Sequence, residues 1–319
     1  LKRGTFVMPT LIELDSFDEL KREIFGPVLH VVRYQRSDLA SLLEQINASG
    51  YGLTLGVHTR IDETIAQVVN TAKVGNLYVN RNIVGAVVGV QPFGGEGLSG
   101  TGPKAGGPLY MYRLLSTRPQ DAVAKQLGST SKLPPEQTAA VQAFNDWAGK
   151  NEPSLVALSQ QFSELAQSGS VHVLPGPTGE RNTYSLLPRE HVLCLAEERN
   201  DLLVQLAAAL AVGSQVLWHE QPLTQELFAA LPKEVQKRVR LIGDWASSEA
   251  SFDAILHHGD SDQLRAVCEQ AAQRKGAIVG VHGLNKGETD IPLERLLIEH
   301  ALSINTAAAG GNASLMTIG

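Results

Sequence analysis

QPFGGEGLSGTGPKAGGP, residues 91–108, is the stretch that decides the fold. It holds seven glycines and three prolines in eighteen residues, and it follows the apolar run at residues 83–90 directly. Glycine permits positive φ and close approach to the backbone, whereas proline restricts the neighbouring turns. The stretch therefore predicts a shaped binding loop held between apolar flanks. A glycine-rich surface crossover without function is the alternative.

The composition is that of an ordinary globular protein. The chain has 319 residues, is 43% hydrophobic and carries a net charge of −6, with acidic and basic residues interspersed. This length permits two domains, and the charge pattern argues against nucleic-acid binding by this segment. No apolar run approaches the roughly 18 residues of a membrane span, and no signal peptide is expected. The two cysteines, Cys194 and Cys268, suit reduced thiols in a cytoplasmic protein.

Strands and helices are predicted to alternate before the loop. Residues 6–14 read as a buried strand, and Ser16 with Glu19 forms a capping box that starts a short helix over residues 17–22. Strands are expected at residues 28–34, 53–60 and 77–81 from their β-branched and apolar content. Helices are expected at residues 39–48, with Ser37 as N-cap, and at residues 61–72. This order predicts the α/β class.

The composition changes between residues 116 and 137, which are polar and rich in proline, and this change predicts a domain boundary. Helical spacing of apolar residues then predicts helices at residues 138–149 and 154–167. Residues 179–221 read as strand, turn, helix and strand, the βαβ unit of a Rossmann-like domain.

Four segments resemble the C-terminal part of the aldehyde dehydrogenase superfamily. They are EIFGPVLHVVRY (residues 23–34), GYGLTLGVHTR (50–60), KVGNLYVNR (73–81) and the loop itself. The form SGTGPKAGGP resembles the corresponding loop in the branch of the family that oxidises glutamate semialdehyde, or pyrroline-5-carboxylate. The last fifteen residues resemble the C-terminus of the long members of that same family. The resemblance implies the C-terminal part of a catalytic domain (residues 1–118), a linker (119–137), a degenerate Rossmann-like domain (138–303) and a tail (304–319).

The resemblance also implies which residues contact ligands. Glu23 corresponds to the carboxylate that binds the nicotinamide ribose, and Phe25 to the ring that packs beside it. Phe93 corresponds to the aromatic residue that lines the aldehyde tunnel. Gly106 and Gly107 correspond to the residues whose backbone N–H groups hold the α-carboxylate of the substrate. Consecutive amides in a glycine turn do form anion-binding nests, and a surface carboxylate beside a core phenylalanine is the alternative for Glu23 and Phe25.

The implied reaction is NAD-dependent oxidation of glutamate semialdehyde to glutamate, with an FAD-dependent proline dehydrogenase upstream in a longer polypeptide. The nucleophilic cysteine of the family precedes the EIFGP motif, so neither Cys194 nor Cys268 corresponds to it. We therefore expect the isolated chain to be inactive and to need the upstream part of the same polypeptide. The resemblance further implies a homo-oligomer, cytoplasmic with peripheral membrane contact. The rival hypothesis is a structural, oligomerisation and active-site lid module without catalysis of its own.

Several residues in the first half invite a functional interpretation that the sequence does not support. His58 has no nucleophile beside it in sequence and is expected to be structural. Lys104 is expected to be solvated. Asn80 and Arg81 are expected to tie loops together.

The second half departs from the family where a dinucleotide would bind. Glu197 and Glu198 stand in the turn that should face the cofactor, and carboxylates there would repel a pyrophosphate. Cofactor binding in this half is therefore not expected. His257 and His258 beside Asp260 lack any recognisable metal-ligand spacing, so no metal site is predicted.

Overall fold

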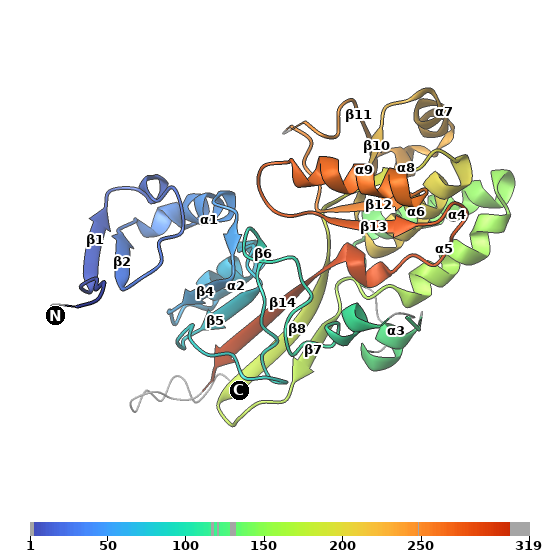
Figure 1. Ribbon diagram of the computed structural model, residues 1–319. Coiled ribbons are helices and arrows are strands. Elements are labelled where there is room, and N and C mark those ends of the chain that lie inside the picture. The colour runs from blue at the N-terminus through green and yellow to red at the C-terminus, as the bar shows by residue number, and fades with distance from the viewer. Residues whose placement is uncertain (1–2, 116–117, 120, 128–131, 248, 307–319) are drawn as a thin grey trace.

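A computed structural model describes residues 3–115, 118–119, 121–127, 132–247 and 249–306 (Figure 1). These residues form two five-stranded sheets and two small two-stranded sheets, with helices packed on the larger ones. The predicted α/β class is therefore confirmed. No helix among the described residues is both long and apolar enough to cross a membrane.

The first small sheet stands apart from the rest of the molecule (Figure 1). Strand β1 (Thr10–Leu14) pairs in parallel with β2 (Val28–Val32), and the 3-10 helix Phe17–Glu19 lies between them with the predicted capping box of Ser16 and Glu19. The expectation of a buried strand was wrong, because no other layer covers these strands. Leu11 is 65% exposed and Leu29 is 58% exposed.

The segment up to the loop supplies two helices and two strands of the central sheet. Helix α1 (Leu39–Ala48) follows a 3-10 turn, Arg36–Asp38, so its N-cap is Asp38 and not the predicted Ser37. Strand β4 (Thr54–Val57), helix α2 (Asp62–Thr71) and strand β5 (Asn76–Val79) follow as predicted. Strands β3 (Tyr51–Gly52) and β6 (Glu96–Gly97) form the second small sheet.

The central sheet combines strands from both halves of the chain, in the order β4-β5-β14-β8-β7. Strands β7 (Val171–Leu174) and β8 (Glu180–Pro188) form a hairpin, and β14 (Leu297–Asn305) lies between β8 and β5. It pairs antiparallel with β8 and parallel with β5. Figure 1 shows β14 running out of the second half into the first.

The two faces of β14 have different neighbours, because successive side chains of a strand point to opposite faces. Leu302 and Ile304 pack against the apolar cluster of α1 and α2, which includes Leu43 and Val68. On the opposite face every second residue is buried, namely Leu297, Glu299, Ala301 and Ser303. The loop at residues 91–108 packs against that face through Glu299 and Ser303.

The second half is built on a parallel sheet in the order β11-β10-β9-β12-β13. Its strands are β9 (His191–Leu195), β10 (Gln215–His219), β11 (Val239–Ile242), β12 (Ala254–His258) and β13 (Gly280–Leu284). Helix α6 (Arg199–Val212) links β9 to β10, which confirms the predicted βαβ unit. In chain order this is 3-2-1-4-5, the order of a Rossmann-type sheet.

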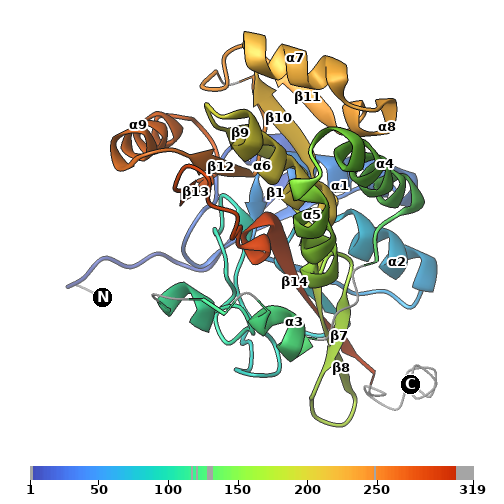
Figure 2. The ribbon, with the colours of Figure 1, turned by 90° about the vertical axis from the view of Figure 1, so that its right-hand side faces the viewer.

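Helices cover both faces of this sheet (Figure 2). Helices α4 (Pro135–Asn151), α5 (Ser154–Leu165), α6, α7 (Pro222–Ala230) and α8 (Lys233–Gln236) share one apolar core with Val192 and Cys194. Helix α9 (Ser261–Ala272) packs on the other face, with Leu193. Because α6 lies between the sheet and α5, its residues from Asp201 to Val212 are all buried.

The stretch predicted to be a linker contains some regular structure. Helix α3 (Ala122–Leu127) lies inside it, and α4 begins at Pro135. Two 3-10 helices complete the described elements, Met111–Leu114 and Leu293–Leu296. The division of the chain at residues 118 and 138 stays a prediction. Residues 304 and 305 of the predicted tail end strand β14, and residues 307–319 lie outside the described residues.

Strand β14 provides a test of how far the two halves depend on each other. The N–H group of Ala301 donates to the carbonyl of Gly75 at 2.9 Å. Replacing Ala301 with Pro removes this donor in a central strand, so we expect the free energy of unfolding to fall by about 3 kcal/mol or more. Urea unfolding measures the loss, with Ala301→Ser as the control that keeps the N–H group. A loss under about 1 kcal/mol for Ala301→Pro would contradict the register described here.

Candidate functional site

The loop at residues 91–108 folds back on itself. The N–H group of Phe93 donates to the carbonyl of Ala105 at 3.0 Å, and the N–H group of Ala105 donates to the carbonyl of Phe93 at 2.8 Å. This pair of bonds places Phe93 next to the turn at residues 104–107. The structure therefore brings together three of the predicted site residues, namely Phe93, Gly106 and Gly107.

Lys104 is buried at the base of that turn, and the expectation of a solvated lysine was wrong. Only 2% of the residue is exposed. Its Nζ donates to Asn76 Oδ1 at 3.1 Å and to the carbonyl of Gly94. Burial lowers the pKa of the Lys104 amine to about 8, although the nearby charge of Glu299 opposes this shift. A Cβ atom at Gly75 would lie 2.7 Å from Nζ, so this glycine makes the room that the lysine needs.

Of the two glycines in the turn at residues 104–107, only Gly106 has the conformation and the free N–H group expected of an anion-binding turn. Gly106 has φ +68°, and no hydrogen bond among the described residues uses its N–H group. The N–H group of Gly107 donates to the carbonyl of Lys104 at 3.1 Å. A Cβ atom at Gly107 would lie 3.0 Å from that carbonyl oxygen. Gly106 therefore has a free donor, whereas the donor of Gly107 is already used within the turn.

A buried carboxylate from the second half supports the same turn. Glu299 is 8% exposed. Its Oε2 accepts the Lys104 N–H at 2.7 Å, and its Oε1 accepts the Tyr184 hydroxyl at 2.8 Å. Burial raises the pKa of Glu299, and these hydrogen bonds oppose that rise. Sequence reasoning missed Glu299 and Tyr184. Glu299 could have been found, because it lies on the same face of an alternating strand as the buried positions 297, 301 and 303.

The start of the loop is tied to the second half as well. Arg81 donates to Glu180 Oε2 at 2.6 Å and to the Ser303 hydroxyl at 2.8 Å. Gln91 donates to the other oxygen of Glu180 at 2.5 Å. Asn80 bonds the N–H group and the carbonyl of Thr59, each at 3.0 Å. The expectation that Asn80 and Arg81 tie loops together is confirmed.

The predicted cofactor residues lie elsewhere. Glu23 and Phe25 precede β2 in the exposed β1–β2 segment, which Figure 1 shows well away from the loop. The Phe25 side chain is 88% exposed. Gly26 follows it with φ +119°, which turns the chain into β2. The structure therefore leaves the Phe25 ring free to pack on a ligand or on another part of a larger protein.

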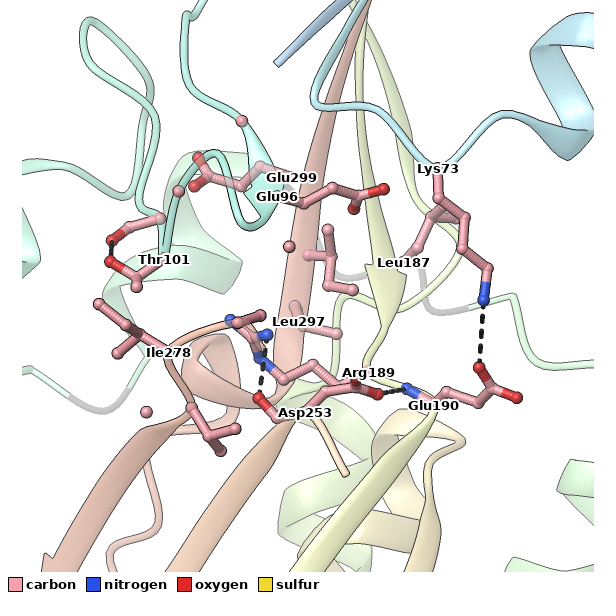
Figure 3. A pocket seen from close by; sticks show the side chains of 18 of the residues that line it. Lys73, Glu96, Thr101, Leu187, Arg189, Glu190, Asp253, Ile278, Leu297 and Glu299 are labelled. Carbon is pink, nitrogen blue, oxygen red and sulfur yellow. Dashed lines mark hydrogen bonds and ion pairs between the residues drawn. The ribbon is translucent and has the colours of Figure 1, made fainter. Parts of the chain in front are cut away.

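A cavity of about 350 Å³ separates the loop from the parallel sheet (Figure 3). Glu96 and Thr101 line it from the loop, and Arg189, Asp253 and Ile278 line it from the second half. Arg189 donates to the carbonyl of Asp253 at 3.2 Å. The cavity is thus bordered by both halves of the chain, with charges of both signs around it.

Glu197 and His258, at the carboxyl ends of the parallel strands, each contact other protein groups beside a cavity of about 320 Å³. Glu197 forms an ion pair with Lys286 at 2.7 Å, which lowers the pKa of the Glu197 carboxyl. His258 Nδ1 lies 2.8 Å from Gln205 Nε2, and its Nε2 lies 2.8 Å from the carbonyl of Glu288. No cluster that could hold a metal ion occurs within the described part of the chain. The carboxylate at the switch point argues against a bound pyrophosphate.

Neither cysteine is placed as a nucleophile. Cys194 is 1% exposed in strand β9, and burial raises the pKa of its thiol, so a thiolate is disfavoured there. Cys268 is exposed on helix α9. Both lie in the second half, away from the loop.

Known proteins are similar to this chain over spans of different length. Residues 1–118 match the aldehyde dehydrogenase family. The chain is 64% identical to the bifunctional protein PutA of Escherichia coli over 99% of its own length, but it spans only 24% of that protein. It is 44% identical to a 1-pyrroline-5-carboxylate dehydrogenase of Staphylococcus saprophyticus over 36% of its length, which is 22% of that enzyme.

A solved structure shows the same fold. Proline utilization A from Corynebacterium freiburgense matches 95% of this chain with a TM-score of 0.58 and 24% identity, and the match covers 27% of that protein. The chain is therefore similar over nearly its whole length to about a quarter of the bifunctional PutA polypeptide, and its residues 1–118 match the aldehyde dehydrogenase family.

Proposed function

We propose that this chain completes the site at which a bifunctional enzyme of proline breakdown oxidises glutamate semialdehyde to glutamate. The observation that carries the proposal is the turn at residues 104–107, where the free Gly106 N–H group lies beside Phe93. A free backbone donor on an exposed glycine suits the α-carboxylate of the substrate, and an aromatic ring suits its aldehyde-bearing chain. Gly107, which has no side chain, contributes the space for this approach, while its N–H group stays bonded to the Lys104 carbonyl.

NAD is the proposed hydride acceptor. Glu23 offers a carboxylate that can take both ribose hydroxyls, and the exposed Phe25 ring offers a face for the nicotinamide or its sugar. These two residues fit the group, because each is on the surface of the β1–β2 segment. The bound NAD supplies the oxidation itself, whereas the residues of this chain bind and orient it.

The nucleophile and an FAD-dependent proline dehydrogenase belong, in this proposal, to the upstream part of a longer polypeptide. The β1–β2 sheet supports that view. Parallel strands are normally covered on both faces, yet Phe6, Val7, Met8 and Leu11 are more than 60% exposed. We infer that the upstream part covers this sheet. A cytoplasmic location and peripheral contact with the membrane stay predictions.

The second half fits a different role, as a structural and assembly module. Its edge strand β7 exposes Val171 by 65% and Val173 by 71%, and an open apolar edge strand is suited to pairing with another chain. This observation favours a homo-oligomer. The proposed lid function of the C-terminal tail concerns residues outside those described.

The anchoring role of Gly106 can be tested in the full-length protein that contains this chain. Alanine at Gly106 must adopt φ +68° with its Cβ 3.4 Å from Val88 Cγ1. We expect the backbone to shift and the KM for glutamate semialdehyde to rise about tenfold, since left-handed alanine costs about 1–2 kcal/mol. Steady-state kinetics measures this rise. Gly85→Ala is the control, because Gly85 has φ +80° but no neighbour within 4 Å, and equal effects of both variants would contradict the role.

The cofactor role of Glu23 can be tested by Glu23→Gln. Loss of a carboxylate that binds two ribose hydroxyls should raise the KM for NAD about tenfold and leave the KM for the aldehyde unchanged. The exposed Glu63, in the first turn of α2, provides the control variant Glu63→Gln. An unchanged KM for NAD in Glu23→Gln would remove this residue from the cofactor site.

The isolated chain of 319 residues should not oxidise glutamate semialdehyde. It has no cysteine in residues 1–118, and the thiol of Cys194 is buried. The production of NADH from NAD and the semialdehyde, followed at 340 nm, measures the activity. Turnover by the isolated chain that survives a Cys268→Ser substitution would show that catalysis needs no upstream cysteine.

A further inference from the structure

One carboxylate from the second half lies directly beneath the glycine turn of the first half. Glu299 reaches the turn from β14, 195 residues away from Lys104 in the sequence. Its Oε1 would lie 3.2 Å from a Cβ atom at Gly107, and its Oε2 would lie 3.7 Å from one at Gly102. The carboxylate therefore occupies the space under both ends of the segment from Gly102 to Gly107.

Lys104 is fixed through both its backbone and its side chain. Its N–H group donates to Glu299, its carbonyl accepts from Gly107, and its Nζ is bound by Asn76 and Gly94. Gly106 itself makes none of these bonds. The position of its free N–H group consequently depends on how firmly the neighbouring Lys104 is fixed.

The charge on Glu299 would by itself repel a substrate carboxylate bound above the turn. The Lys104 ammonium is buried at the same turn, and its positive charge opposes part of this repulsion, as it also lowers the pKa of the Glu299 carboxyl against the effect of burial. Tyr184 satisfies the second carboxylate oxygen from strand β8. The pair can thus hold the backbone without presenting a net negative charge to the ligand.

We propose that Glu299 is a positioning residue, which holds the turn at residues 104–107 in the shape that binds the α-carboxylate of the aldehyde substrate. The inference rests on the proposed function of this loop. It assigns to the second half a part in substrate selection, in addition to assembly. Loss of Glu299 should therefore affect aldehydes that carry a carboxylate far more than neutral ones.

Glu299→Ala in the full-length protein, with butanal as the neutral comparison substrate, tests this inference. We expect the KM for glutamate semialdehyde to rise about tenfold or more, because the Lys104 N–H group loses its buried acceptor. The kcat/KM for butanal should stay within about twofold. Glu299→Gln should restore most of the loss, since its amide oxygen can accept the Lys104 N–H group while its NH₂ group donates to the Tyr184 oxygen.

Asp201→Ala is the matched control. Asp201 is a buried carboxylate of the second half that accepts the Gly287 N–H at 3.1 Å and makes no contact with the loop. Asp201→Ala should change neither the KM for glutamate semialdehyde nor the kcat/KM for butanal.

If Glu299→Ala does not fold, as judged by its melting temperature, Tyr184→Phe takes its place. That variant removes one hydrogen bond to the carboxylate, and we expect a rise of about threefold in the KM for the semialdehyde.

Two results would overturn the inference. Equal losses with both aldehydes would make Glu299 a general stability residue, and no loss with either would make it dispensable. Gly106→Ala, measured in parallel, separates these results from failure of the proposed function. If Gly106→Ala impairs the semialdehyde alone and Glu299→Ala does not, only the inference on Glu299 fails. If Gly106→Ala is without effect, the anchoring function itself fails.

Discussion

The insertion of β14 between β5 and β8 is the constraint on which the rest of the structure depends. Its hydrogen bonds join a sheet begun by residues 54–79 to a hairpin at residues 171–188. Its two faces then serve different purposes. Leu302 and Ile304 complete the small apolar core under α1 and α2, while Glu299 and Ser303 receive the glycine-rich loop. One strand thereby provides both the cohesion of the molecule and the floor of its candidate site.

Lys104 and Glu299 beneath the loop are costly to bury, and each is held by hydrogen bonds. An isolated charge in a protein interior costs several kcal/mol, and a paired one costs much less. Lys104 Nζ donates to Asn76, and Glu299 accepts from Tyr184 and from the Lys104 N–H group, so both buried charges are stabilised by hydrogen bonds. A network of this kind restricts the backbone more sharply than apolar packing does, because hydrogen bonds are directional. A loop made mostly of glycine has little side-chain packing of its own, so it depends on such directional contacts.

The sequence predicted the elements better than their environment. Periodicity located α1, α2, α5 and the βαβ unit, and the glycine and proline content located the loop at residues 91–108. It could not show that β1 is exposed, because an apolar strand looks the same whether or not its covering layer belongs to the same stretch of chain. It also gave the wrong environment for Lys104, whose burial depends on the space left by Gly75 and on a carboxylate 195 residues away. Contacts between distant residues, such as Arg81 with Glu180, follow from topology and have no local signal.

The position of β14 also has a consequence for the order of folding during synthesis. Asn305 bonds the carbonyl of Asn80 across 225 residues of chain. At about 5–20 residues per second, a ribosome needs roughly ten seconds or more to make that interval. During this time β5 can pair only with β4, and its other edge has unpaired backbone groups that can pair with another strand. The nascent first half therefore keeps an unpaired sheet edge until the second half has been made.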